Sequence, residues 1–111
     1  MEFLITEYTH CDLIEISGRI DSYTSPKIAE VLRALFTDGH HHLVIDMEKV
    51  TYLSSSGMLV FVNAQKQCKR QDRGEIVFSN ISEHVLSSLK LAGFDQLFNF
   101  YDDVVSAVGR F

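Results

Sequence analysis

The feature that most constrains this chain is the alternation of short strand-type runs with amphipathic helical segments along its length. Two runs that alternate apolar and polar residues come first, and the short turn between them predicts an antiparallel hairpin. Each later helical pattern is followed by another apolar run until a final helix, giving the order β-β-α-β-α-β-α-β-α. Strands that alternate with helices form mostly parallel sheets with right-handed crossovers. The sequence therefore predicts an α/β fold with a mixed, mostly parallel sheet, in a single domain over residues 1–111.

The ends of several elements can be predicted from residue type. Ser25 is a favoured N-cap residue, Pro26 suits the first helical position, and Gly39 suits the left-handed position after a helix. The consecutive apolar residues 43–45 indicate a strand that is buried on both faces. The expected strands are 2–8, 12–18, 42–46, 74–80 and 96–101. The expected helices run from Ser25 to Gly39, from Ser55 to Arg70, from Ser82 to Ala92, where Gly93 closes the helix, and onward from a cap at Asp102.

Composition and charge narrow the class of protein. The 111 residues have a formal charge of −5 and an apolar fraction of 46%, which is ordinary for a globular protein. Scattered Lys and Arg residues do not form the basic footprint of a nucleic-acid binder or a membrane patch. The longest apolar run, Met58 to Val62, is far shorter than the roughly 18 residues of a membrane span, and the N-terminus has no signal-peptide pattern. We expect a cytoplasmic protein that neither binds nucleic acid nor inserts into a membrane.

The cysteines and histidines form no recognisable metal or redox motif. Cys11 and Cys68 are far apart and belong to no CxxC pair, so we expect two buried, reduced thiols. His40, His41 and His42 lead into a strand, where alternate side chains point to opposite faces, so at most two could share an ion. We therefore expect these histidines to be solvated loop residues, and the sequence predicts no metal and no cofactor.

Residues 51–62 read TYLSSSGMLVFV and place three serines and a glycine at the start of an apolar helix. Ser54 is suited to cap that helix, and Gly57 allows the helix start to approach its surroundings closely. A Ser at a helix N-terminus lies beside unpaired backbone N–H groups, which would tolerate a phosphate. The G-x-S-x-G turn of serine hydrolases is absent, so we expect no enzyme. We expect Asp46, at the end of the preceding strand, to be structural.

This ordered set of motifs resembles the STAS domain, the family of the anti-sigma factor antagonists. The central match begins with the strand end Val44–Asp46 and the segment Val50–Leu53, which leads into the serines. Ser54–Gly57 then aligns with the family's D-S-[ST]-G. The upstream segment SGRIDSYTSPKIAEVL resembles the family's G-x-[LI]-D segment and first helix. The downstream segment LKLAGFDQLFNFYDDVVSAV resembles the C-terminal segment of the family. The resemblance extends from the first strand to the last helix.

The resemblance implies a non-catalytic protein that acts by partner switching. In this family the unphosphorylated antagonist binds an anti-sigma factor that is also a serine kinase, which frees a sigma factor. The kinase phosphorylates the Ser that follows the motif Asp, the partner is released, and a PP2C-type phosphatase resets the system. Ser55 holds that position here, and Asp21 is the aspartate of the G-x-[LI]-D segment. The resemblance thus implies phosphorylation at Ser55 and partner contacts from Asp21, Ser54, Ser55, Ser56, Gly57, Met58 and Leu59.

Two positions depart from the family pattern and leave alternatives open. Ser54 replaces the motif Asp, which leaves Ser54 and Ser56 as rival acceptors of the phosphate. Leu59 replaces the second small residue of the usual G-L-G. The first alternative function is a STAS scaffold, or a cytoplasmic subunit of a transport system, that is not phosphorylated. The second is a small-ligand sensor that holds a nucleotide or lipid beside the serines, although no glycine-rich phosphate loop supports it.

Overall fold

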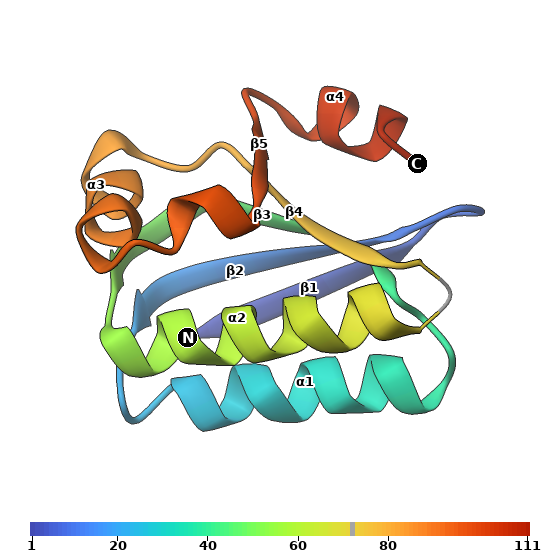
Figure 1. The fold of residues 1–111 in the computed structure, drawn as a ribbon, viewed down its shortest axis with the longest axis horizontal. Helices are drawn as coiled ribbons and strands as arrows, with labels where there is room; N and C mark the ends of the chain where they lie inside the picture. Colours follow the sequence, from blue (N-terminus) through green and yellow to red (C-terminus); the bar gives the residue numbers. More distant parts are fainter. Residues whose placement is uncertain (72) are drawn as a thin grey trace.

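A mixed sheet with two long central strands organises the molecule (Figure 1). In the computed structural model, which describes residues 1–71 and 73–111, five strands lie in the order β1-β2-β3-β4-β5. The first pair is antiparallel and the later pairs are parallel, which confirms the predicted sheet. The strands are β1 (Glu2–Glu7), β2 (Asp12–Ile20), β3 (His42–Leu53), β4 (Glu75–Ser79) and β5 (Asn99–Tyr101).

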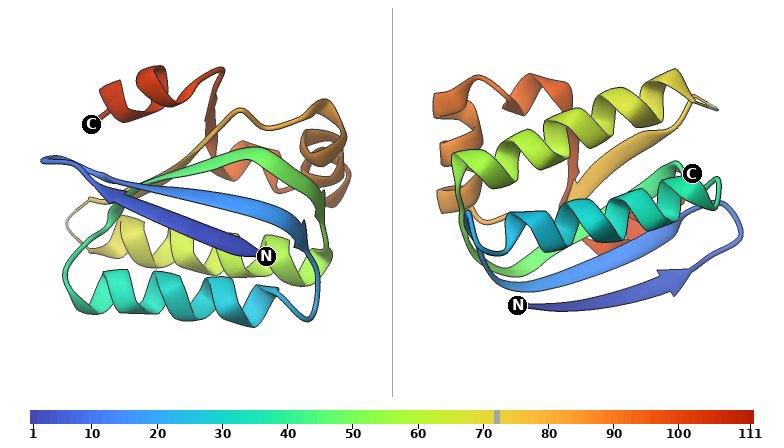
Figure 2. Two further views of the ribbon diagram at one scale, coloured as in Figure 1. Left: turned by 180° about the vertical axis from the view of Figure 1, so that it is seen from behind. Right: turned by 90° about the horizontal axis from the view of Figure 1, so that it is seen from below.

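Helices cover both faces of this sheet. The first two helices lie side by side on one face of the sheet, and the last helix lies on the other face (Figures 1 and 2). The third helix lies at one end of the sheet, near the start of the second helix. Among the described residues, no helix is both long enough and apolar enough to cross a membrane. The helices are α1 (Ser25–Thr37), α2 (Ser55–Arg70), α3 (Glu83–Ala92) and α4 (Val104–Gly109), with a 3-10 turn η1 (Asp95–Leu97).

Apolar side chains fill a large layer between the sheet and the α1–α2 pair and a smaller layer under α4. In the large layer, the rings of Phe61 and Phe78 meet edge to face with their centroids 5.3 Å apart. In the small layer, Val44 and Val77 pack with Ala107 of α4. Because alternate residues of β3 enter opposite layers, the strand is buried on both faces, as its apolar run predicted.

Two strand boundaries differ from the prediction. β3 does not end at Asp46 but continues to Leu53, because β2 also continues and pairs with it as far as the Ile20–Leu53 register. The last strand is shorter than expected: residues 95–97 form the 3-10 turn η1, and only residues 99–101 pair with β4. The segment that approaches the three serines is therefore sheet rather than loop.

Two predicted helix caps are each wrong by one residue. Thr24, rather than Ser25, occupies the position before α1, and Ser25 is the first residue of the helix. Asp103, rather than Asp102, caps α4, because its Oδ1 accepts the Ser106 N–H at 2.7 Å. Residue type predicted a polar residue at both positions, but only Asp103 forms a side-chain capping hydrogen bond, since the Thr24 side chain forms none to α1.

Two glycines end helices as predicted. Gly39 and Gly93 follow α1 and α3 with φ values of 83° and 79°, the left-handed conformation that glycine adopts without strain. α3 begins one residue after its predicted start, because Ser82 caps it by accepting the Val85 N–H at 3.2 Å.

The three consecutive histidines are not all solvated, so that expectation is wrong. His41 is buried and stacks on Phe36, with ring centroids 5.2 Å apart and planes within 5°. His42 is half-buried and meets the ring of Phe111 at an edge. His40 is also partly open to solvent, with 33% of its side chain exposed. The rings of Phe36 and Phe111 therefore cover His41 and His42.

Both cysteines are free and buried, as expected. Burial raises the pKa of the Cys68 thiol to about 12, and burial with the nearby Asp12 charge raises the pKa of Cys11. Because the thiolate is the reactive form, we expect a thiol reagent such as DTNB to leave both residues unmodified in the native protein. Both should react within minutes in concentrated guanidinium chloride, and fast labelling of native Cys68 would contradict this burial.

Candidate functional site

Ser54 caps α2 as predicted and fixes the start of the helix. Its amide donates to the Ile20 carbonyl at 2.8 Å, where the pairing of β2 with β3 ends. Its backbone is extended, with φ −78° and ψ 166°, and its hydroxyl oxygen accepts the Gly57 N–H at 3.2 Å. The end of the sheet therefore determines where the three serines lie.

A chain of hydroxyl groups joins the start of α2 to the start of α1. Ser54 Oγ lies 2.9 Å from Ser56 Oγ, which in turn lies 3.2 Å from Ser25 Oγ. The buried Ser25 hydroxyl also donates to the backbone carbonyl of Asp21. Ser25 thus connects the two helix starts, and the hydroxyls of Ser54 and Ser56 already have structural partners.

Asp21 caps the turn that leads from β2 into α1. Its Oδ1 accepts the N–H groups of Tyr23 at 3.0 Å and Thr24 at 3.1 Å, and its own amide donates to Thr24 Oγ1 at 2.8 Å. The bond from the Thr24 amide is the largest cause that holds the pKa of Asp21 below its ordinary value. The predicted partner residue is therefore a fixed carboxylate that is ionised at neutral pH.

Ser55 differs from the other two serines of the motif. It lies in the first turn of α2 with an exposed side chain, and its hydroxyl forms no hydrogen bond with the residues that the structure describes. The backbone N–H groups of Ser55 and Ser56 lack intrahelical carbonyl partners, because they lie at a helix start. A phosphate on Ser55 would carry about −1.5 to −2 charges beside these donors and the positive end of the helix dipole. The position can accept a phosphate without breaking the hydroxyl chain.

The next three residues of α2 divide between the interior and the surface. A Cβ on Gly57 would lie 2.5 Å from Ile20 Cγ2 and 2.9 Å from Leu53 Cδ1, so the helix start approaches the strand ends closely, as expected. Met58 is 6% exposed and belongs to the large apolar layer, whereas Leu59 is 49% exposed. Of these three residues, Leu59 is therefore the one that presents apolar surface to solvent.

Two aromatic residues near the serines were not predicted as part of the site. Tyr23, in the turn that Asp21 caps, is 89% exposed. Tyr52 lies opposite Arg19 in the β2–β3 register, and the Arg19 guanidinium lies 4.3 Å from the centre of its ring. Tyr23 could have been found from the sequence, because it is an aromatic residue within the polar turn IDSYTSP. The Arg19–Tyr52 contact depends on strand register, which the sequence does not reveal.

Asp46 has the structural role that we expected. It is buried, and its Oδ1 accepts hydrogen bonds from Ser79 Oγ at 3.0 Å and Asn80 Nδ2 at 2.9 Å. These bonds tie β3 to the end of β4. The described hydrogen bonds of Ser54 and Ser56 lead to hydroxyls and a backbone N–H, so neither serine is paired with an imidazole or carboxylate that could activate it as a nucleophile.

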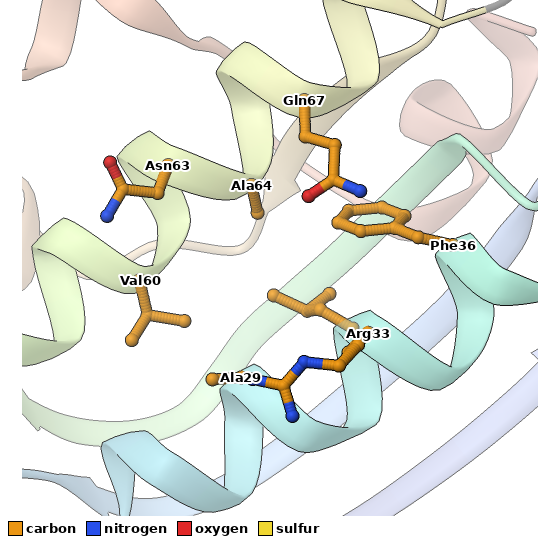
Figure 3. Close-up of a pocket in the computed structure, with 8 residues that line it drawn as sticks. Ala29, Arg33, Phe36, Val60, Asn63, Ala64 and Gln67 are labelled. Carbon is orange, nitrogen blue, oxygen red and sulfur yellow. The ribbon is translucent and has the colours of Figure 1, made fainter.

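A shallow pocket of about 210 Å³ lies between α1 and α2 (Figure 3). None of the three serines lines it, so this pocket does not place a ligand beside them, as the small-ligand alternative requires. Its walls combine apolar side chains with the polar groups of one Arg, one Asn and one Gln. The lining residues are Ala29, Leu32, Arg33, Phe36, Val60, Asn63, Ala64 and Gln67.

Comparisons with known proteins agree with this architecture. The family model of the STAS domain matches residues 2–107. The anti-sigma-B factor antagonist of Listeria monocytogenes is 33% identical over 88 residues, which cover 79% of this chain and 75% of that protein. An anti-sigma factor antagonist from Mycobacterium paratuberculosis has a TM-score of 0.87 at 21% identity, covering 98% of this chain and 92% of the other. The Bacillus cell fate determinant SpoIIAA in its phosphorylated form has a TM-score of 0.74 at 15% identity, covering 98% of each chain. This chain belongs to the STAS domain family, whose anti-sigma factor antagonists are regulatory proteins and not enzymes.

Proposed function

We propose that this protein is an anti-sigma factor antagonist that acts in the cytoplasm by partner switching. Its unphosphorylated form binds an anti-sigma factor that is also a serine kinase, which frees a sigma factor. Phosphorylation of Ser55 releases the partner, and a PP2C-type phosphatase reverses the modification. The observation that carries this proposal is the exposed Ser55 hydroxyl, which makes no hydrogen bond to the described residues while Ser54 and Ser56 bond to each other.

The local electrostatics explain how a phosphate would release the partner while the domain stays folded. The free N–H groups at the start of α2 tolerate the added charge within the domain. A partner packed against the neutral Ser55 would have to desolvate the phosphate, and any acidic groups of the partner would repel it. The fixed Asp21 carboxylate adds to the negative charge of the same face. Each loss of about 1.4 kcal/mol in binding free energy weakens affinity about tenfold.

The relatives and the replaced motif position are consistent with this proposal. The Listeria protein that is 33% identical is named an anti-sigma-B factor antagonist, which supports the class of partner. A Bacillus protein of the same fold is known in a phosphorylated form. Ser54 stands where the family motif has an aspartate, but its hydroxyl still caps α2. Because Ser and Asp are both good caps, the replacement preserves the helix start that presents Ser55.

A charged substitution at Ser55 tests the switch. We expect Ser55→Asp to bind the kinase at least about tenfold more weakly than wild type, and Ser55→Ala to bind within about twofold of wild type. Wild type and both variants would be used as baits in lysate of the native cells, and mass spectrometry would identify a captured GHKL-type kinase. Calorimetry with that purified kinase would then give the dissociation constants.

Ser87→Asp is a matched control, because Ser87 is an exposed serine of α3 and the substitution changes the net charge equally. It should leave the affinity unchanged. Equal affinities of Ser55→Asp and wild type would contradict the switch, as would a phosphate found on Ser56 after incubation with the kinase and ATP. Capture of the same transporter subunits or scaffold proteins by wild type and Ser55→Asp would instead support the non-phosphorylated adaptor.

A further inference from the structure

The end of the molecule opposite the three serines contains a second group of chemically active side chains. The β1–β2 hairpin turns there over residues 8–11, and the segment between α1 and β3 passes beside it (Figure 1). A pocket of about 190 Å³ lies between the two segments, and His10, Asp12 and His40 are among the residues that line it. The proposed partner switch uses none of these side chains.

Three side chains at this pocket bring metal-ligating atoms together. The ligand atoms of Glu7, Asp12 and His40 all lie within 4.8 Å of one another. His40 Nδ1 is 2.6 Å from Asp12 Oδ2, and the Asp12 side chain is only 6% exposed. Glu7 lies at the exposed end of β1, so its carboxylate can adjust its position. The cluster therefore combines an imidazole–carboxylate pair that is already in contact with a third ligand that can move.

The charges around this cluster favour a cation. Glu7 and Asp12 are direct partners in the antiparallel β1–β2 ladder, where like charges repel. The buried Asp12 carboxylate needs positive charge nearby, yet within the described residues neither Glu7 nor Asp12 pairs with a Lys or Arg. The described positive partner of Asp12 is His40, whose Nδ1 lies 2.6 Å from Asp12 Oδ2. One imidazolium can offset only one of these carboxylates.

We propose that Glu7, Asp12 and His40 bind a divalent transition-metal ion of the zinc class. Zinc takes nitrogen and oxygen ligands at about 2.0–2.2 Å, so the ligand atoms of a tetrahedral site lie about 3.4 Å apart. The cluster reaches that spacing when Glu7 moves inward and the His40–Asp12 contact opens by about 0.8 Å. A water molecule supplies the fourth ligand, because the cluster offers three protein ligands. The imidazole disfavours magnesium and calcium, which prefer sites made of oxygen atoms.

A bound ion would connect the β1–β2 hairpin to the segment that enters β3. It would replace the repulsion between Glu7 and Asp12 with a shared bond to the metal. It would also stabilise the native state, by an amount that rises with the logarithm of the free metal concentration once that concentration exceeds the dissociation constant. The proposed ligands lie where β1 ends and where β2 and β3 begin, whereas Ser55 follows the far end of β3. The metal would therefore act on the stability of the fold and leave the proposed switch unchanged.

Titration of ZnCl₂ into the purified chain, with any purification tag removed, tests the proposal. We expect one saturable zinc site by calorimetry, a higher midpoint of thermal unfolding with zinc, and no comparable effect of MgCl₂. His40→Gln and Glu7→Gln should each weaken zinc binding at least about tenfold. Because Glu7 is exposed, Glu7→Gln tests the site in a chain whose core is intact.

His84→Gln is the matched control, because His84 is an exposed histidine of α3 outside the cluster. Its zinc affinity should equal that of wild type, which separates the proposed site from adsorption by surface histidines. The absence of saturable zinc binding would overturn the proposal. Equal zinc affinities of wild type, His40→Gln and Glu7→Gln would also overturn it.

Discussion

Replacing Gln65 with Met should lower the free energy of unfolding by about 3 kcal/mol, because it leaves buried backbone groups without partners. Gln65 is 3% exposed; its Oε1 accepts the Ile76 N–H at 2.7 Å, and its Nε2 donates to the carbonyls of Ile76 at 3.1 Å and Leu97 at 2.9 Å. The pairing of β4 with β5 begins only at Val77, so this side chain satisfies the edge of β4 where β5 is absent. Urea unfolding followed by circular dichroism would measure the change.

Gln67→Met is the control, because it makes the same substitution two residues later in α2. Gln67 is half-buried beside the α1–α2 pocket, and its side chain forms no hydrogen bond with other described residues. The free energy of unfolding of Gln67→Met should differ from that of wild type by less than about 0.5 kcal/mol. A loss of about 3 kcal/mol is a large part of the roughly 5–15 kcal/mol that stabilises a domain. Equal urea midpoints for the two variants would contradict the role of Gln65.

Periodicity and residue type predicted most of the fold because these signals are local. The alternation of apolar residues located β1 and β2, and Gly39 and Gly93 marked the ends of α1 and α3. The far end of β3 could not be predicted, because residues 47–53 form a strand only where β2 continues beside them. The role of Gln65 could not be predicted either, since its hydrogen-bond partners lie 11 and 32 residues away.

The candidate site was predictable in its positions but not in its connections. Residue type identified Ser54 as a cap, and the family motif identified Ser55 and Asp21. The contact between Ser25 and Ser56 spans 31 residues and depends on the way α1 and α2 start side by side. That contact gives Ser56 a structural partner, which separates it from Ser55 in a way that the sequence alone did not. The Glu7, Asp12 and His40 cluster was missed for the same reason, since 28 residues separate Asp12 from His40.

Replacing Gly57 with Ala should destabilise the protein by about 1–2 kcal/mol, although alanine favours helices. The added Cβ would lie 2.5 Å from Ile20 Cγ2 and 2.9 Å from Leu53 Cδ1, and both side chains are buried. Overpacking of a core typically costs about 1–3 kcal/mol, and two contacts shorter than 3.0 Å place this cost in the upper part of that range, about 2–3 kcal/mol. Helix propensity returns about 1 kcal/mol of it, which leaves the net loss. The urea midpoint should therefore fall, and kinase binding should weaken because the start of α2 must shift.

Gly109→Ala separates the clash from the effect of alanine itself, because Gly109 ends α4 and a Cβ there would meet no atom within 4 Å. It should keep or slightly raise the urea midpoint, since alanine is the better helix former. A double-mutant cycle with Ile20→Ala then assigns the clash to its partner. In the Ile20→Ala background the cost of Gly57→Ala should shrink, because the nearest obstructing methyl group is gone. An unchanged cost in that background would place the strain at Leu53, and no cost in the wild-type background would mean that α2 can shift freely at its start.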